Sequence, residues 1–192
     1  STEADPLRYL APIAAGFAQR LAAPLPTQAA AAVAAVQGKP WQQQLASLVA
    51  DVNTRIRYMG DWRISENGYL PFTLAQIEQR GFGDCKDMAL TLAAMLRAAG
   101  LQADVALVRA DANNTPLLLS PQNGLNHAIV RLQVAGQSYW LDPTQKLNVL
   151  HGPVRVLQDR TVFVLTDDGQ VKTDRIPLVL AETSYNRQQL DF

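Results

Sequence analysis

The sequence predicts an α+β fold, in which a block of helices is followed by a mostly antiparallel sheet. Apolar residues recur at helical spacing through the first half of the chain, and short alternating segments separated by turn residues fill the second half. No internal repeat or low-complexity tail interrupts this order. Helices grouped ahead of strands are typical of the α+β class, because parallel α/β sheets need the two elements to alternate.

Three helices are expected in the N-terminal part. Residues 7–22 carry apolar side chains at helical spacing, and an Ala-rich segment over residues 27–37 ends before a glycine. The third helix begins at Pro40, a residue type that suits a first helical turn. Its apolar stripe consists of Trp41, Leu45, Leu48, Val49, Val52 and Ile56. We expect residues 1–38 to form a helical extension and residues 39–192 to form the main core.

The next long helix is expected to begin at the single cysteine. Glycines and a proline over residues 59–71 predict a loop, and a short helix over 73–80 follows it. Asp84 is a good N-cap, and Asp87 three residues later makes an acidic variant of the capping box, so the helix begins at Cys85. Its apolar stripe consists of Met88, Leu92, Met95, Leu96 and Ala99.

The second half predicts the sheet. Strands are expected over residues 101–110, 126–134, 137–142, 161–165 and 176–180. A polar loop over 111–124 separates the first two, and Ala135-Gly136 predicts a hairpin between the second and the third. The turn residues Asp167-Asp168-Gly169 are expected to join the last two strands.

Composition excludes several classes of protein. Apolar residues make up 48% of the 192 residues, as in ordinary globular domains, so the chain is long enough for one core and at most a small addition. Seventeen basic and seventeen acidic residues cancel, and no basic stripe indicates a nucleic-acid partner. One cysteine excludes an internal disulfide and, with two histidines, argues against a structural zinc site. We expect no metal, no cofactor and no membrane span, since no apolar run approaches about 18 residues.

The position of Cys85 at a helix N-terminus suits a nucleophile. Unpaired backbone N–H groups and the positive end of the helix dipole favour the thiolate over the thiol. The same N–H groups can receive the oxyanion that forms when a thiolate attacks a carbonyl. The Cys85 N–H would supply one donor, and Gln79, six residues upstream, is a weak candidate for the second.

The hairpin register brings a histidine and an aspartate together. If Val134 pairs with Gln137 across the two-residue turn, His127 and Asp142 lie on one face of the sheet as diagonal neighbours. Diagonal Cα atoms are about 7–8 Å apart, within reach of long side chains. In this arrangement Cys85 would attack a carbonyl, His127 would act as its base and then as an acid, and Asp142 would orient the ring.

Structural roles compete with each of these assignments. A lone cysteine is often an inert buried apolar residue, and His127 is equally well read as a polar residue at a strand start. Asp142 precedes a proline and could be a turn residue, while Asp84 could be a helix cap alone. Trp140, which could line a substrate groove, could equally belong to the core.

Four motifs follow one another along the chain: Gly83-Asp84-Cys85-Lys86-Asp87, Leu96-Arg97-Ala98-Ala99-Gly100, Asn126-His127-Ala128-Ile129-Val130 and Tyr139-Trp140-Leu141-Asp142-Pro143-Thr144. Together they resemble the bacterial transglutaminase-like superfamily. More narrowly, they resemble the core domain found behind an N-terminal β-rich domain of unknown function in exported bacterial proteins. The segments Ile56-Arg57-Tyr58 and Tyr69-Leu70-Pro71 extend the resemblance, which covers roughly residues 40–165.

This resemblance implies a papain-like α+β fold, with the helix of Cys85 packed on an antiparallel sheet, and a triad of Cys85, His127 and Asp142. Similar domains crosslink glutamine to lysine, hydrolyse peptide bonds, cleave other amides or have lost activity. Lys86 stands where the eukaryotic crosslinking enzymes have an aromatic residue, which argues against crosslinking. The resemblance also implies an exported, periplasmic protein with flanking domains.

The function expected from the sequence is thiol-dependent acyl transfer on an amide bond of a peptide or protein substrate. A cysteine peptidase, an amidase and a transglutaminase-like acyltransferase all fit this description, since they share the acyl-enzyme. The alternative is a non-catalytic module that binds a peptide or protein in the groove between the helix and the sheet.

Overall fold

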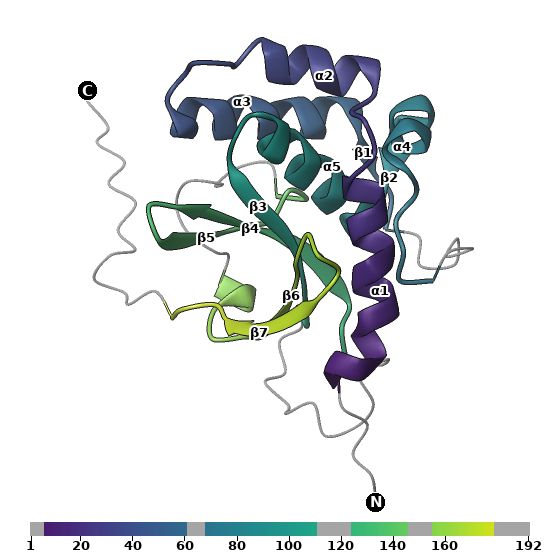
Figure 1. Ribbon diagram of the computed structural model, residues 1–192, viewed down its shortest axis with the longest axis vertical. Coiled ribbons are helices and arrows are strands. Elements are labelled where there is room, and N and C mark those ends of the chain that lie inside the picture. The colour runs from purple at the N-terminus through teal and green to yellow at the C-terminus, as the bar shows by residue number, and fades with distance from the viewer. Residues whose placement is uncertain (1–5, 61–67, 111–123, 146–154, 179–192) are drawn as a thin grey trace, which may run out of the picture.

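The computed structural model describes residues 6–60, 68–110, 124–145 and 155–178, and these form an α+β fold as predicted (Figure 1). The helices are α1 (Pro6–Leu21), α2 (Thr27–Ala34), α3 (Trp41–Arg55), α4 (Leu74–Arg80) and α5 (Cys85–Ala98). The strands are β1 (Arg57–Tyr58), β2 (Phe82–Gly83), β3 (Gln102–Val108), β4 (His127–Val134), β5 (Gln137–Leu141), β6 (Thr161–Leu165) and β7 (Val171–Arg175). A short 3-10 helix spans Arg155–Leu157.

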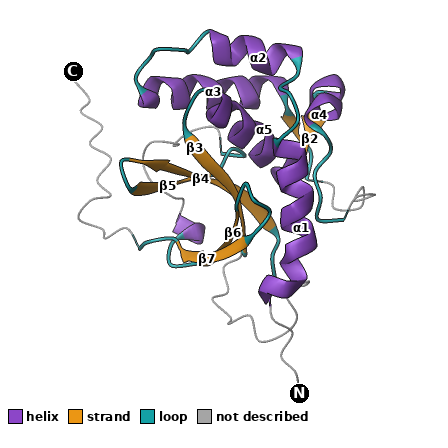
Figure 2. Cartoon of the chain, in the orientation of Figure 1, coloured by secondary structure: helices purple, strands orange, loops and turns teal. Residues whose placement is uncertain are grey.

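The main sheet has five antiparallel strands in the order β5-β4-β3-β6-β7, and it curls around one side of the molecule (Figure 2). Val134 pairs with Gln137, so the predicted register of the β4–β5 hairpin is confirmed. Ala135 and Gly136 have φ angles of 50° and 79°, the left-handed conformation that a two-residue hairpin turn with the twist of its strands requires.

The prediction of a last strand over residues 176–180 is wrong. β7 spans Val171–Arg175 instead. The tight turn after β6 pairs Leu165 with Val171, so the residues that follow Val171 pair with the rest of β6. These residues alternate little in hydropathy and are largely exposed, as an edge strand allows. The prediction relied instead on the apolar residues that follow β7 in the sequence. Residues 179 and 180 lie outside the described residues.

Two short strands were not expected. β1 and β2 pair in parallel, with Tyr58 opposite Gly83, and the segments that contain them are otherwise loop. The expected loop over 111–124 lies almost wholly outside the described residues, as does much of the loop over 59–71. The second helix ends at Ala34, before the expected residue 37, because the chain there continues as turns up to Gly38.

Helix α5 lies at the centre of the fold, between the sheet and the other helices (Figure 1). Every residue from Asp87 to Leu96 is buried, because β3 and β4 cover one side of the helix and α1, α2, α3 and α4 contact the rest. The N-terminal helices share this core, since Leu10 and Phe17 of α1 and Val33 of α2 belong to the same buried cluster. No helix within the described ranges combines the length and apolarity needed to cross a bilayer.

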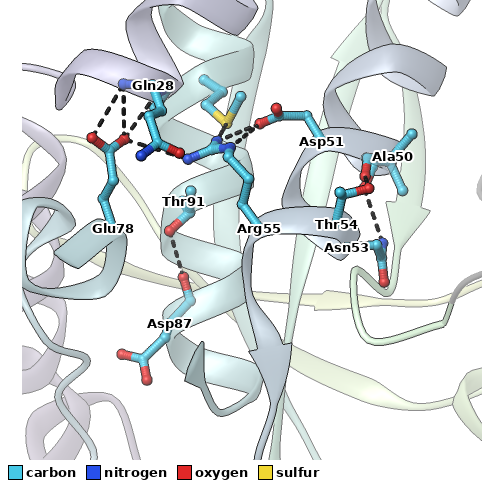
Figure 3. A network of polar contacts seen from close by, with 12 residues as sticks. Gln28, Ala50, Asp51, Asn53, Thr54, Arg55, Glu78, Asp87 and Thr91 are labelled. Carbon is cyan, nitrogen blue, oxygen red and sulfur yellow. Dashed lines mark hydrogen bonds and ion pairs between the residues drawn. The ribbon is translucent and has the colours of Figure 1, made fainter. Parts of the chain in front are cut away.

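A polar network ties the N-terminal helices together (Figure 3). The Glu78 carboxylate of α4 accepts the backbone N–H groups of Gln28 and Ala29, at the start of α2. It therefore caps a helix that has no side-chain cap of its own, and its charge suits the positive end of that helix. Arg55 of α3 pairs with both Glu78 and Asp51, which fixes α2, α3 and α4 relative to one another.

Candidate active site

The first turn of α5 carries Cys85 in a fully formed capping box. The Asp84 carboxylate accepts the N–H groups of Lys86 at 2.8 Å and Asp87 at 3.4 Å, and the Asp87 carboxylate accepts the Asp84 N–H at 3.0 Å. Lys86 also pairs with the Asp84 carboxylate through its ammonium group. The Cys85 N–H donates no hydrogen bond within the described residues, so this donor at the helix start is available to a ligand.

Asp87 does more than complete the cap. Its other carboxylate oxygen accepts the N–H of Phe72 at 2.9 Å, so the buried side chain joins the segment before α4 to the first turn of α5. A Cβ on Gly83 would lie 2.6 Å from the Asp87 Cβ, which explains why a glycine precedes the cap. Burial, and secondly the charge of Asp84, raise the pKa of Asp87 above its ordinary value.

His127 begins β4, and its ring lies against Asp142 just beyond the end of β5. His127 Nε2 is 2.8 Å from Asp142 Oδ2, and both side chains are largely buried, with exposed fractions of 13% and 6%. The second carboxylate oxygen, Oδ1, accepts the Thr144 N–H at 3.0 Å and the Thr144 hydroxyl at 2.7 Å. Asp142 therefore both orients the imidazole ring and holds the turn at the end of β5.

The electrostatics of this pair favour a protonated imidazole ring. Burial by itself lowers the pKa of His127, but the hydrogen bond to Asp142, the neighbouring Cys85 and the charges of both groups outweigh it and raise the pKa to about 10. Burial by itself raises the pKa of Asp142, but the interactions with His127 and Thr144 outweigh it and lower the pKa below the ordinary value. Because Nε2 faces Asp142, the other ring nitrogen, Nδ1, is the one available to the Cys85 thiol.

Cys85 and His127 line the same cavity, which has a volume of about 500 Å³. Aromatic, small and aliphatic side chains supply most of its wall, and the polar groups gather at the start of α5 and of β4. The lining residues are Tyr58, Gly60, Gly68, Tyr69, Asp84, Cys85, Lys86, Leu107, Leu125, Asn126, His127 and Ala128. The cavity is large enough for an extended side chain or a short stretch of peptide next to the thiol.

Two weaker candidates from the sequence lie elsewhere. Gln79 is exposed on α4 and is not among the residues that line the cavity, so the fold does not bring it to Cys85. Trp140 is buried in a second apolar cluster with Ile129 and Val108, and it does not line the cavity either. Asp84 does line the cavity, and its carboxylate is used as a helix cap.

Three lining residues with polar side-chain groups received no role from the sequence. Tyr58 and Tyr69 lie in the two short segments that extend the family resemblance, which was the only signal for them in the sequence. Asn126 directly precedes His127, and its side-chain oxygen accepts the N–H of Ala110 at 2.7 Å, which joins the start of β4 to the chain beyond β3. In the described ranges, no group of three or more histidine, cysteine or acidic residues is placed to hold a metal ion.

Comparison with known proteins gives a distant match in structure. No protein-family model matches the chain, and no curated protein sequence matches it. A crystal structure from Parabacteroides distasonis, of a protein described as a "putative protease", superposes with a TM-score of 0.58 and 15% sequence identity. The match covers 85% of this chain and 31% of that chain, so the chain spans less than a third of that protein's length. This chain therefore has the fold of one part of that protein.

Proposed function

We propose that the chain is a thiol-dependent acyl-transfer enzyme that acts on an amide bond of a peptide or protein. The observation that carries the proposal is the arrangement of Cys85, His127 and Asp142. A thiol at a helix N-terminus shares a cavity with a histidine, and the far nitrogen of that histidine is 2.8 Å from a buried carboxylate. The sequence resemblance to the transglutaminase-like superfamily supports the same assignment independently of these distances.

In this mechanism the Cys85 thiolate attacks the amide carbonyl carbon, and the carbonyl electron pair moves onto oxygen. His127, protonated next to Asp142, gives its proton to the leaving amine as the C–N bond breaks and an acyl-enzyme forms. Neutral His127 then takes a proton from the incoming nucleophile. If that nucleophile is water the reaction is hydrolysis, and if it is an amine the reaction is transamidation.

Hydrolysis is the outcome we favour. Lys86 follows the nucleophile, in the place where eukaryotic crosslinking enzymes have an aromatic residue. It is one of the residues that line the cavity, and its ammonium group pairs with Asp84. A cation at this position disfavours the approach of a second, protonated lysine amine, because like charges repel over short distances in a partly buried site. Water carries no such penalty.

The test is to trap the acyl-enzyme. Incubation with a peptide library, followed by acid quenching and mass spectrometry, is expected to show an acyl group on Cys85, and Cys85→Ser is expected to turn over no substrate while keeping its melting temperature. Iodoacetamide is expected to alkylate Cys85 readily at about pH 6, and more slowly in His127→Ala. If Cys85 instead reacts like a free thiol, whose pKa is about 8.5, and no acyl group is found, the chain is a binding module and not an enzyme.

A further inference from the structure

The proposed chemistry needs a second hydrogen-bond donor for the oxyanion, and the structure offers one. The Cys85 N–H is free at the start of α5, but a tetrahedral intermediate is normally stabilised by two donors. Gln79, the candidate from the sequence, is exposed and is not among the residues that line the cavity. Other donors have to be sought among the residues that line the cavity with Cys85.

Tyr58 is placed next to the nucleophile by the short parallel strand pair. β1 runs alongside β2, with Tyr58 opposite Gly83, two residues before Cys85. The Met59 N–H donates to the Gly83 carbonyl at 2.8 Å, and the Arg57 N–H donates to the Gly81 carbonyl at 3.0 Å. These bonds on either side of Tyr58 fix its backbone relative to the first turn of α5, and the Tyr58 side chain lines the cavity with Cys85 and His127.

The hydroxyl group of Tyr58 is not used to hold the fold together. Within the described residues it has no hydrogen-bond partner, and the side chain is 49% exposed, so packing does not explain its presence. Its hydroxyl oxygen lies close to Gly60, where an added Cβ would stand 3.1 Å away, so the glycine leaves room for the phenol ring. A tyrosine hydroxyl can donate one hydrogen bond, and Tyr58 lines the same cavity as Cys85, where a bound ligand could accept it.

The charges near Tyr58 agree with this reading. Burial, followed by the negative charges of Cys85, Asp84 and Asp142, raises the pKa of the Tyr58 hydroxyl above 10. The hydroxyl therefore stays protonated at neutral pH and keeps its proton available for donation. Tyr58, Asp84 and Cys85 line one cavity, so the hydroxyl belongs to the wall of the space in which new negative charge would develop.

We propose that the Tyr58 hydroxyl and the Cys85 N–H together form the oxyanion hole of this site. This inference rests on the proposed acyl-transfer function. As the bond from Cys85 Sγ to the carbonyl carbon forms, the C=O electron pair moves onto oxygen, and this oxygen accepts both hydrogen bonds. When the electron pair returns, the bond to the leaving group breaks and both donors are released.

Two reactions of the same thiol separate this role from a structural one. Acylation by p-nitrophenyl acetate passes through an oxyanion, whereas alkylation by iodoacetamide displaces iodide and forms none. Tyr58→Phe removes only the hydroxyl oxygen, and it is expected to slow acylation of Cys85 by about 10²-fold while changing alkylation by less than about twofold. The matched control is Tyr139→Phe, which removes a hydroxyl that donates to Gln137 on the exposed hairpin and should change neither rate.

Each outcome distinguishes the two proposals. Selective loss of acylation in Tyr58→Phe supports the oxyanion role. Unchanged acylation, or an equal fall in both rates, overturns it while leaving the thiol enzyme intact. If the wild-type protein is alkylated but not acylated, the acyl-transfer function itself fails, and the role of Tyr58 falls with it.

Discussion

Asp142 uses its two carboxylate oxygens for two different purposes. Oδ2 is 2.8 Å from His127 Nε2, whereas Oδ1 accepts two hydrogen bonds from Thr144. The catalytic and the turn interpretations of this residue, which compete in the sequence, are therefore compatible in the structure. A substitution that keeps one carboxylate oxygen and replaces the other can separate the role towards His127 from the role in the turn.

Asp142→Asn is that substitution. Asn can keep Oδ1 as the acceptor for Thr144, but its amide N–H would face His127 Nε2 and force the proton onto Nδ1, the nitrogen that must receive the thiol proton. We expect activity to fall by about 10²–10⁴-fold with little change in melting temperature. Asp174→Asn, which alters a more exposed carboxylate paired with Arg131, is the control. A parallel fall in stability and activity would mean that Asp142 serves the turn alone.

The shifted pKa values of the pair predict a pH dependence of stability. The pKa of His127 is raised from 6.5 to about 10, so its stabilising contribution is complete below pH 6.5 and is lost as the pH rises towards 10. The pKa of Asp142 is lowered, so its contribution is present above the ordinary value of 3.8 and is lost on acidification below it.

Melting temperatures of the wild type and of His127→Gln, measured from about pH 5 to about pH 10, check this dependence. The advantage of the wild type is expected to be constant at the acidic end and to shrink above pH 6.5. An advantage that grows with pH would show that His127 is neutral in the folded protein and that the ion pair does not form.

Helix α5 depends at its first turn on carboxylates that reach backbone N–H groups. Asp84 caps the helix, and Asp87 connects the cap to the Phe72 N–H. The position of Cys85 is thus set by hydrogen bonds on both sides of it. The same interactions fix the segment before α4, close to Tyr69 in the cavity wall.

Asp87→Ala removes this connection. The N–H groups of Asp84 and Phe72 would lose their acceptor in a buried environment, which is expected to cost about 2–4 kcal/mol of unfolding free energy. Urea denaturation measures this loss, and alkylation of Cys85 should become slower as the first turn loosens. Asp174→Ala, which removes an ion pair of a partly exposed carboxylate, should cost no more than about 1 kcal/mol. Equal effects of the two variants would contradict the structural role of Asp87.

Taken as a whole, the molecule extends its core into the N-terminal helices. Phe17 is fully buried in the cluster that contains α5, and the Arg20 guanidinium donates to the Pro71 carbonyl at 2.8 Å. Gly16 lets α1 approach the same segment, because an added Cβ would lie 2.5 Å from Leu70. Helix α1 therefore supports the segment that Asp87 holds from the other side.

Phe17→Ala tests whether α1 belongs to the cooperative unit. A large cavity in the shared core is expected to cost about 3–5 kcal/mol of unfolding free energy. Far-UV circular dichroism and tryptophan fluorescence, to which the buried Trp140 of β5 contributes, should report the same, lowered urea midpoint. A transition confined to the helical signal, with the fluorescence transition left at its original midpoint, would show instead that the first helices unfold as a separate extension.

Local signals were sufficient for the elements that carry Cys85, His127 and Asp142. Apolar spacing and a capping box locate the start of α5 at Cys85, and a two-residue turn sets the register that puts His127 beside Asp142. These features depend on residues close together in the sequence, where capping, helical period and turn geometry act without help from the rest of the chain. For this reason the sequence alone was enough to predict the α+β class and the proximity of His127 and Asp142.

Other features depend on contacts between distant segments. Three such features have no local signature in the sequence. They are the pairing of Tyr58 with Gly83, the absence of Gln79 and Trp140 from the cavity lining, and the place of β7 at the sheet edge. A two-residue strand has almost no pattern to read, and the direction of a side chain depends on what packs against its element. Burial and long-range pairing are properties of the assembled core, so the position of Tyr58 in the same cavity wall as Cys85 could be recognised only in the folded structure.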